Sequence, residues 1–283
     1  MNVSTGEIIA VKEVDLRLGG DVPHSAQCNP GGPNHDSSPD DAQYLDELRA
    51  IRTKNEVLID LDHPNVVRYL GVDIVSRAQE VILQLSHDSL DMHGALDKRG
   101  AFPEATTKSF GKQILAGLDF LHSHGVVHGD LTPRKVSTYL RDVALYLGNL
   151  TPTSQILLTP TGECKISSLE YRRTPPPNAI TPLVFYMAME LVKECAQPTA
   201  ACDIWSVGCV LLEMWTGQRP WPGEETSFVL FKLYSGKAPS VPSGVILSDS
   251  AENLRARCFV VDPTARPSAA DLLRHPYFEL PEG

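Results

Sequence analysis

The sequence predicts an α+β protein of two lobes, a small β-rich lobe over residues 1–85 and a larger helical lobe over residues 86–283. Two observations lead to this prediction. Short β-prone runs are concentrated before residue 86, and after it apolar residues recur at the three-and-four spacing of buried helices. A length of 283 residues is enough for two lobes that each bury a core.

The small lobe is predicted from β-prone runs at Glu7–Val14, Val66–Leu70 and Val81–Leu85, with a helix over Tyr44–Leu61. Alternation in the first run places Ala10 and Lys12 on one face of a strand. Lys12 on a half-buried face would point into a cleft and meet an anion, whereas the alternative is a solvated lysine on an edge strand. Residues 18–41 are rich in Gly, Pro, Ser and Asn, which predicts a flexible loop.

The large lobe is predicted to contain helices over Thr106–His124, Asp203–Trp215, Leu254–Phe259 and Ala269–Leu273, and a hairpin of two strands at residues 155–158 and 164–167. The first of these helices has its apolar residues on one face. The run from Asp203 to Trp215 is apolar on most sides, which predicts that this helix is the centre of the lobe. Residues 134–152 have no stable period, and we interpret them as an insertion.

One stretch between the first helix and the hairpin carries candidate chemistry. Val126 and Val127 predict a short strand after the helix, which would hold His128 and Asp130 rigidly at the mouth of the lobe. A carboxylate in that position can accept a proton from a bound hydroxyl group. The alternative interpretation is that Asp130 is a turn or capping residue.

Composition argues against several classes of function. The net charge is −10 and the pI is about 5.3, so binding to nucleic acid phosphates is disfavoured. We find neither an apolar run that spans a bilayer nor a signal sequence, and we expect a cytoplasmic protein without a membrane partner. The six cysteines form no C-x-x-C pair, which indicates reduced thiols and no metal site.

Six motifs follow one another in a recognisable order along the chain. They are IAVK at residues 9–12, HPNVVRYLG at 63–71, HGDL at 128–131, YMAME at 186–190, DIWSVGC at 203–209 and DPTARPS at 262–268. In this order they resemble a protein kinase domain, most closely those of the MAP kinase kinase kinases. The resemblance implies a two-lobed protein kinase-like fold, ATP-dependent phosphorylation of Ser or Thr, and protein partners that are kinases or substrates of a signalling cascade.

The resemblance also assigns roles to individual residues. Lys12 would contact the α and β phosphates of ATP, and Asp130 would be the catalytic base. Glu190 and Arg266 would form a buried ion pair in the large lobe, and Asp203 would brace the backbone of the catalytic loop.

The magnesium positions depart from the family pattern. Ser168 stands where the family has the aspartate of Asp-Phe-Gly, and Lys135 stands five residues after Asp130, where it has an asparagine. If residues 134–152 are treated as an insertion, Gln155 takes that place instead. Mg²⁺ prefers negatively charged oxygen ligands, so we expect its ligands to be replaced here, although ATP binding stays open. Gly129 also replaces the arginine of the catalytic His-Arg-Asp.

The small lobe is expected to be incomplete, because no glycine-rich loop precedes residue 9. We expect that the gene model places the start of the protein too late, and that residues 134–152 derive from a retained non-coding stretch. Three functions follow as alternatives: a pseudokinase that binds other proteins, an active Ser/Thr kinase that uses Lys12 and Asp130, and a product that folds poorly. The replaced magnesium ligands favour the pseudokinase.

Overall fold

The computed structural model describes residues 8–15, 53, 56–75, 78–85, 90–133, 156–159, 161–167, 182–193 and 197–279. Within these ranges, only the backbone is described for residues 8–15, 72–75, 78–85, 90 and 91. The predicted loop at residues 18–41 and the predicted insertion at 134–152 lie outside the described residues.

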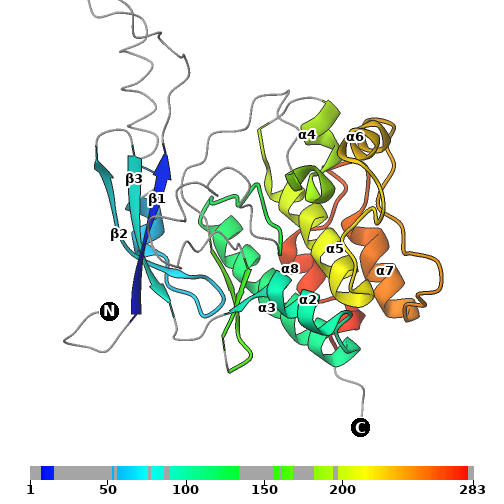
Figure 1. Ribbon diagram of the computed structural model, residues 1–283, viewed down its shortest axis with the longest axis horizontal. Helices are drawn as coiled ribbons and strands as arrows, with labels where there is room; N and C mark the ends of the chain where they lie inside the picture. Colours follow the sequence, from blue (N-terminus) through cyan, green and yellow to red (C-terminus); the bar gives the residue numbers. More distant parts are fainter. Residues whose placement is uncertain are drawn as a thin grey trace, which may run out of the picture.

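An antiparallel sheet of three strands lies at one end of the protein (Figure 1). Its order is β1-β3-β2, formed by β1 (Ile8–Asp15), β3 (Ala78–Leu85) and β2 (Arg68–Val75). These strands confirm the three β-prone runs. Lys12 lies in β1 opposite Val81 of the central strand. Of the helix predicted to end at Leu61, the structure describes helical backbone at residues 53 and 56–60.

A second, smaller sheet forms beside the helical lobe from β4 (Leu90–Asp91), β5 (Ile156–Leu158) and β6 (Cys164–Ile166). Antiparallel pairing of β5 with β6 confirms the predicted hairpin. Val66 makes a parallel bridge to Ile166, and the Asn65 amide donates to the Gln113 side chain at 3.1 Å and to the Cys164 carbonyl at 3.0 Å. The segment that leads into β2 is therefore bound to the large lobe.

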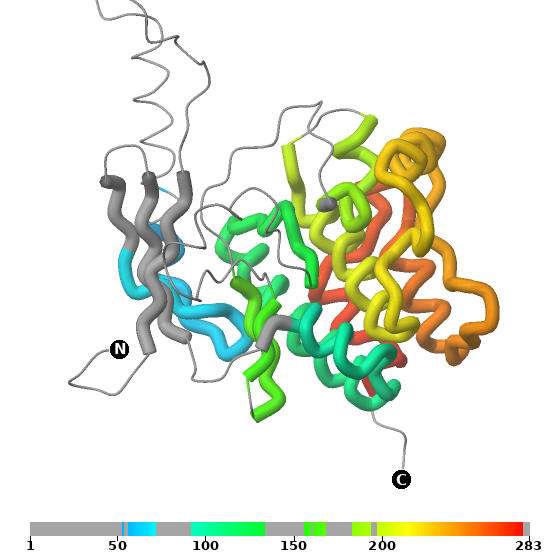
Figure 2. Tube along the Cα trace, in the orientation of Figure 1, coloured from blue at the N-terminus to red at the C-terminus, as the bar shows by residue number. Residues whose placement is uncertain are grey.

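The large lobe is built around two long helices, α3 (Glu104–Ser123) and α5 (Ala200–Thr216). The remaining elements are α2 (Met92–Arg99), η1 (Pro182–Tyr186), α4 (Met189–Lys193), α6 (Thr226–Tyr234), α7 (Asp249–Cys258), α8 (Ala269–Leu273) and η2 (Pro276–Phe278). In the tube of Figure 2 these segments surround α5, and fourteen of its residues are buried, which confirms its predicted central place. The helices predicted at Leu254–Phe259 and Ala269–Leu273 correspond to α7 and α8.

Four cysteines fall within the described residues, and all four are buried free thiols: Cys164, Cys202, Cys209 and Cys258. Burial raises the pKa of Cys258 to about 12 despite the nearby positive charges of Arg266 and Arg255. These thiols therefore carry no negative charge at neutral pH. In the part of the chain that the structure describes, no helix combines the length and the apolar character needed to cross a membrane.

His275 gives the fold a pH dependence. Its Nδ1 accepts a hydrogen bond from the Tyr277 backbone N–H at 3.1 Å, and its Nε2 lies 2.8 Å from the Asn253 side-chain oxygen. Both hydrogen bonds can form only when the ring is neutral and carries its proton on Nε2. Burial lowers the pKa of His275 below 6.5, the Arg257 charge adds to this, and Glu279 opposes it. As the pH falls below about 6.5, His275 therefore becomes protonated in the unfolded chain before it does in the folded chain, and the folded state loses stability. We expect the urea midpoint to fall as the pH is lowered from about 7.5 to about 5.5.

The matched variant for this prediction is His275→Gln, which has no titrating group at this position. Its urea midpoint should fall less than that of the wild type over the same pH range. Burial and the charge of Lys165 also lower the pKa of His63. His63 therefore adds a loss of stability at low pH that is the same in the wild type and the variant. Equal slopes for the two proteins would contradict the assignment to His275.

Candidate functional site

The site predicted at His128 and Asp130 is organised by the side chain of Asp203, near the start of α5. This carboxylate is 1% exposed, and it accepts hydrogen bonds from the backbone N–H groups of His128 at 2.9 Å and Gly129 at 2.7 Å. A third donor is His122 Nε2 on α3, at 2.8 Å. One buried carboxylate thereby joins the two long helices to the loop that carries Asp130.

The ring of His128 fixes the loop from the other side. Its Nδ1 accepts the backbone N–H of Asp130 at 3.3 Å, so the ring proton lies on Nε2, which donates to the Ser167 carbonyl at 3.0 Å. His128 is buried, and Ser167 directly follows β6. The backbone of Asp130 is thus tied through His128 to the segment that leads into Ser168.

Gly129 lies between these two residues in a conformation that other residues rarely adopt. Its φ is +75°, in the left-handed region, and a Cβ atom added there would lie 2.9 Å from the Cβ of Pro198. For residues other than glycine, the left-handed backbone conformation costs roughly 1–2 kcal/mol. The arginine that the family resemblance places here would meet both a strained backbone and the proline ring.

The short strand predicted at Val126 and Val127 is wrong. Both residues lie in an irregular segment after the turn at Gly125, and the Val126 N–H bonds back to the Leu121 carbonyl at 2.9 Å. The backbone donors that follow are taken by Asp203 and not by a neighbouring strand. The loop is held by side-chain acceptors instead of a sheet.

A pocket opens beside Asp130. Its polar wall comes from the loop, at Asp130 and Thr132, and its apolar wall from Leu183, Met187 and Leu191. The space between these walls holds about one water molecule. The pocket therefore offers room for a small polar group beside Asp130.

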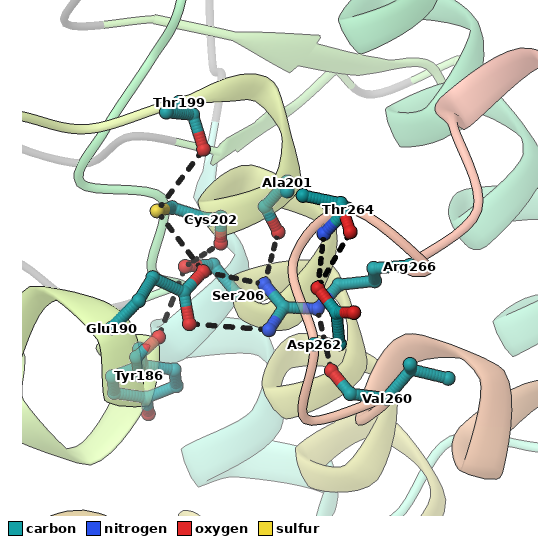
Figure 3. A network of polar contacts seen from close by, with 10 residues as sticks. All are labelled: Tyr186, Glu190, Thr199, Ala201, Cys202, Ser206, Val260, Asp262, Thr264 and Arg266. Atoms are coloured by element: carbon teal, nitrogen blue, oxygen red, sulfur yellow. Dashed lines mark hydrogen bonds and ion pairs between the residues drawn. The ribbon is translucent and has the colours of Figure 1, made fainter.

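A second buried network joins α4, the start of α5 and the segment that carries Arg266 (Figure 3). Glu190 of α4 and Arg266 make a bidentate ion pair at 2.7 and 3.2 Å, with both side chains almost fully buried. Arg266 also donates to the carbonyls of Ala201 at 2.6 Å and Val260 at 3.0 Å, and the Cys202 thiol donates to Glu190 at 3.3 Å. Burial opposes the charge on Glu190, but the hydrogen bonds and the guanidinium of Arg266 outweigh it and lower the pKa of Glu190.

The predicted residues are not all placed in one site. Asp203 contacts the loop that carries Asp130, and Glu190 pairs with Arg266, in two networks linked through α5. Lys12 is in β1 with only its backbone described, and Lys135, Gln155 and Ser168 fall outside the described residues. Among described residues, no group of three or more His, Cys, Asp or Glu could hold a metal ion.

Two contributing residues were missed by the sequence reasoning. His122 lies at the end of α3 and was counted only as part of a helix. Glu213 is a buried acid within the apolar run of α5, and it accepts a short hydrogen bond from the Tyr186 hydroxyl. An acidic residue in the middle of a buried helix requires a hydrogen-bond partner, so the position of Glu213 in the apolar run could have predicted a buried polar contact.

Comparisons with known proteins give one consistent result. Residues 36–278 match the protein kinase domain family. The chain is 31% identical over 291 residues to serine/threonine-protein kinase BCK1/SLK1/SSP31 of Saccharomyces cerevisiae, with 100% of this chain and 17% of that protein covered. It is 30% identical to MAP kinase kinase kinase mkh1 of Schizosaccharomyces pombe (100% and 23% covered). It is 28% identical to mitogen-activated protein kinase kinase kinase 2 of Arabidopsis thaliana (98% and 38% covered).

Proposed function

This chain belongs to the protein kinase domain family, and from that premise we propose that it acts as a pseudokinase that binds kinases or their substrates in a signalling cascade. The chain spans between 17% and 38% of the length of the three relatives named above. The names of two of them, MAP kinase kinase kinases of a yeast and a plant, support a cascade of kinases as the setting.

The proposal rests on a contrast between scaffold and chemistry. The scaffold of the large lobe is complete at Asp203 and at the pair of Glu190 with Arg266. The residues at the magnesium positions offer a hydroxyl at Ser168 and either an ammonium at Lys135 or an amide at Gln155. Without a carboxylate this set does not fit Mg²⁺, which needs negatively charged oxygen ligands. Loss of one preorganised charge contact commonly costs about a hundredfold in rate.

A second candidate function is an active Ser/Thr protein kinase that uses Lys12 and Asp130. The observation that favours it is the anchoring of the Asp130 loop by Asp203 and His128, which supports a catalytic carboxylate in a fixed place beside a pocket. Both functions use the same fold, and they differ in whether ATP and Mg²⁺ are bound together.

A thermal-shift titration with ATP, with and without Mg²⁺, separates the two. Ligand at about 100 times its dissociation constant stabilises a folded protein by about 2.7 kcal/mol, which raises the melting temperature of a chain of this length by about 5 °C. For a pseudokinase we expect no part of any ATP shift to depend on Mg²⁺. The matched variant Ser168→Asp restores one carboxylate, and we expect it to gain a Mg²⁺-dependent shift.

Phosphate transfer to a generic acceptor protein completes the experiment. A Mg²⁺-dependent shift in the wild type, together with transfer that is lost in Asp130→Ala, would replace the pseudokinase proposal with the active kinase. The melting temperature of Asp130→Ala without ligand is measured beside that of the wild type, so that a loss of transfer is separated from a loss of folding.

A further inference from the structure

Helix α6 presents an aromatic face to solvent. Three of its nine residues, Phe228, Phe231 and Tyr234, are 57%, 63% and 64% exposed. At about 100° per residue, Phe231 points directly away from the buried residues Val229 and Leu233, with the other two rings on either side of it. Figure 1 places α6 at the rim of the large lobe, far from the three-stranded sheet. None of the pockets and networks described above uses this face.

Two of the three exposed rings, Phe228 and Phe231, are held in place by contacts within the helix. Phe228 and Phe231 lie against each other, with centroids 6.4 Å apart. The ammonium group of Lys232 lies 5.6 Å from the centroid of Phe228 and 5.3 Å from that of Trp221, and it is paired with Glu224. A preorganised aromatic surface loses little conformational entropy when a partner covers it.

The ends of the helix carry opposite charges. Glu225 is exposed at the N-cap, and Lys237 is exposed just after the C-terminal end. A second ammonium group reaches the same end, since Lys193 Nζ would lie 3.6 Å from a Cβ added at Gly236. The surface is thus negative at one end, aromatic in the middle and positive at the other, while the whole chain carries −10.

We propose that this face joins two copies of the chain in a two-fold symmetric dimer, with the two α6 helices antiparallel and Phe231 of each copy at the centre. Such a symmetric contact requires a surface that is complementary to itself. An antiparallel arrangement brings Glu225 of each copy to Lys237 of the other and pairs the helix dipoles favourably.

The available area sets the strength of this dimer. Aromatic side chains bury roughly 150–250 Å² each when fully enclosed, so three rings exposed by about 60% offer roughly 300–450 Å² per copy. With the charged ends added, two copies approach the roughly 1,200 Å² at the lower limit of stable interfaces. The expected dimer therefore forms in the micromolar range of concentration. It does not depend on whether the chain transfers phosphate.

Sedimentation velocity of the full chain over a series of micromolar concentrations tests the proposal. Phe231→Asp should weaken dimerisation by at least about thirtyfold, because a charge replaces an aromatic residue at the centre of the contact. Val261→Asp, at an exposed apolar position outside α6, is the matched control and should leave dimerisation unchanged. Melting temperatures equal to that of the wild type verify that both variants fold.

A charge exchange tests the antiparallel arrangement. Glu225→Lys and Lys237→Glu should each weaken the dimer about tenfold, since each places like charges together twice. The double variant should recover affinity, and so should an equal mixture of the two single variants, because in the mixed dimer every contact again joins opposite charges. A wild type that stays monomeric, a Phe231→Asp variant that dimerises normally, or a mixture without recovery would each overturn the proposal.

Discussion

Replacing Arg266 with methionine is expected to lower the free energy of unfolding by about 3–5 kcal/mol, because the carboxylate of Glu190 is then left buried without its partner. The same substitution removes donors from the carbonyls of Ala201 and Val260, which lie in separate segments that the guanidinium joins. It also removes the cation that lies 5.2 Å from the ring centroid of Trp205. Urea denaturation at neutral pH measures the loss.

The matched control is Arg274→Met, which breaks the ion pair of Arg274 with Asp271 on the surface, where both side chains are more than half exposed. Exposed pairs contribute at most about 1 kcal/mol. The double variant Glu190→Gln with Arg266→Met should recover part of the stability, because no buried charge remains. Equal losses for Arg266→Met and Arg274→Met would show that burial of the first pair has no energetic consequence.

Replacing Asp203 with alanine is expected to cost about 3–5 kcal/mol as well, since three hydrogen bonds to one buried carboxylate are lost together. Hydrogen bonds to charged groups contribute about 1.5–3 kcal/mol each, and neighbouring contributions do not add fully. The amides of His128 and Gly129 should then exchange with solvent much faster. Hydrogen exchange read by mass spectrometry on the peptide that contains both residues measures this directly.

Two variants grade this effect. Asp203→Asn keeps one acceptor oxygen and should lose less than Asp203→Ala, while His122→Ala removes only one of the three donors and should lose least. Exchange at His128 and Gly129 should follow the same order. If His122→Ala were as destabilising as Asp203→Ala, the helix contact and not the loop contacts would carry the stability.

The two longest helices of the large lobe could be predicted because their apolar residues follow a helical spacing or form a long apolar run. The spacing in α3 and the apolar run of α5 survive in the structure with boundaries shifted by a few residues. Helix α6 was not predicted, since Phe228, Phe231 and Tyr234 place apolar groups on its outer face and hide the period. The strand at Val126 failed for a different reason, because its neighbours bond to Asp203, 75 residues away from His128.

The candidate site was predicted in its parts and not in its connections. Ordered motifs pointed to Asp130, Asp203, Glu190 and Arg266. The structure shows Glu190 paired with Arg266 and Asp203 in contact with the loop, while the catalytic role of Asp130 stays a prediction. No local pattern could reveal that His122 shares the carboxylate of Asp203, because a contact between helices 81 residues apart depends on how they pack. The roles of Lys12, Lys135, Gln155 and Ser168 stay predictions.

The backbone at Gly129 limits which substitutions this position accepts. A mutation that introduced arginine there would meet both the φ of +75° and the ring of Pro198. Such a variant would carry the backbone strain, roughly 1–2 kcal/mol, together with the contact with Pro198. Position 129 therefore accepts a side chain only when the backbone or Pro198 shifts as well.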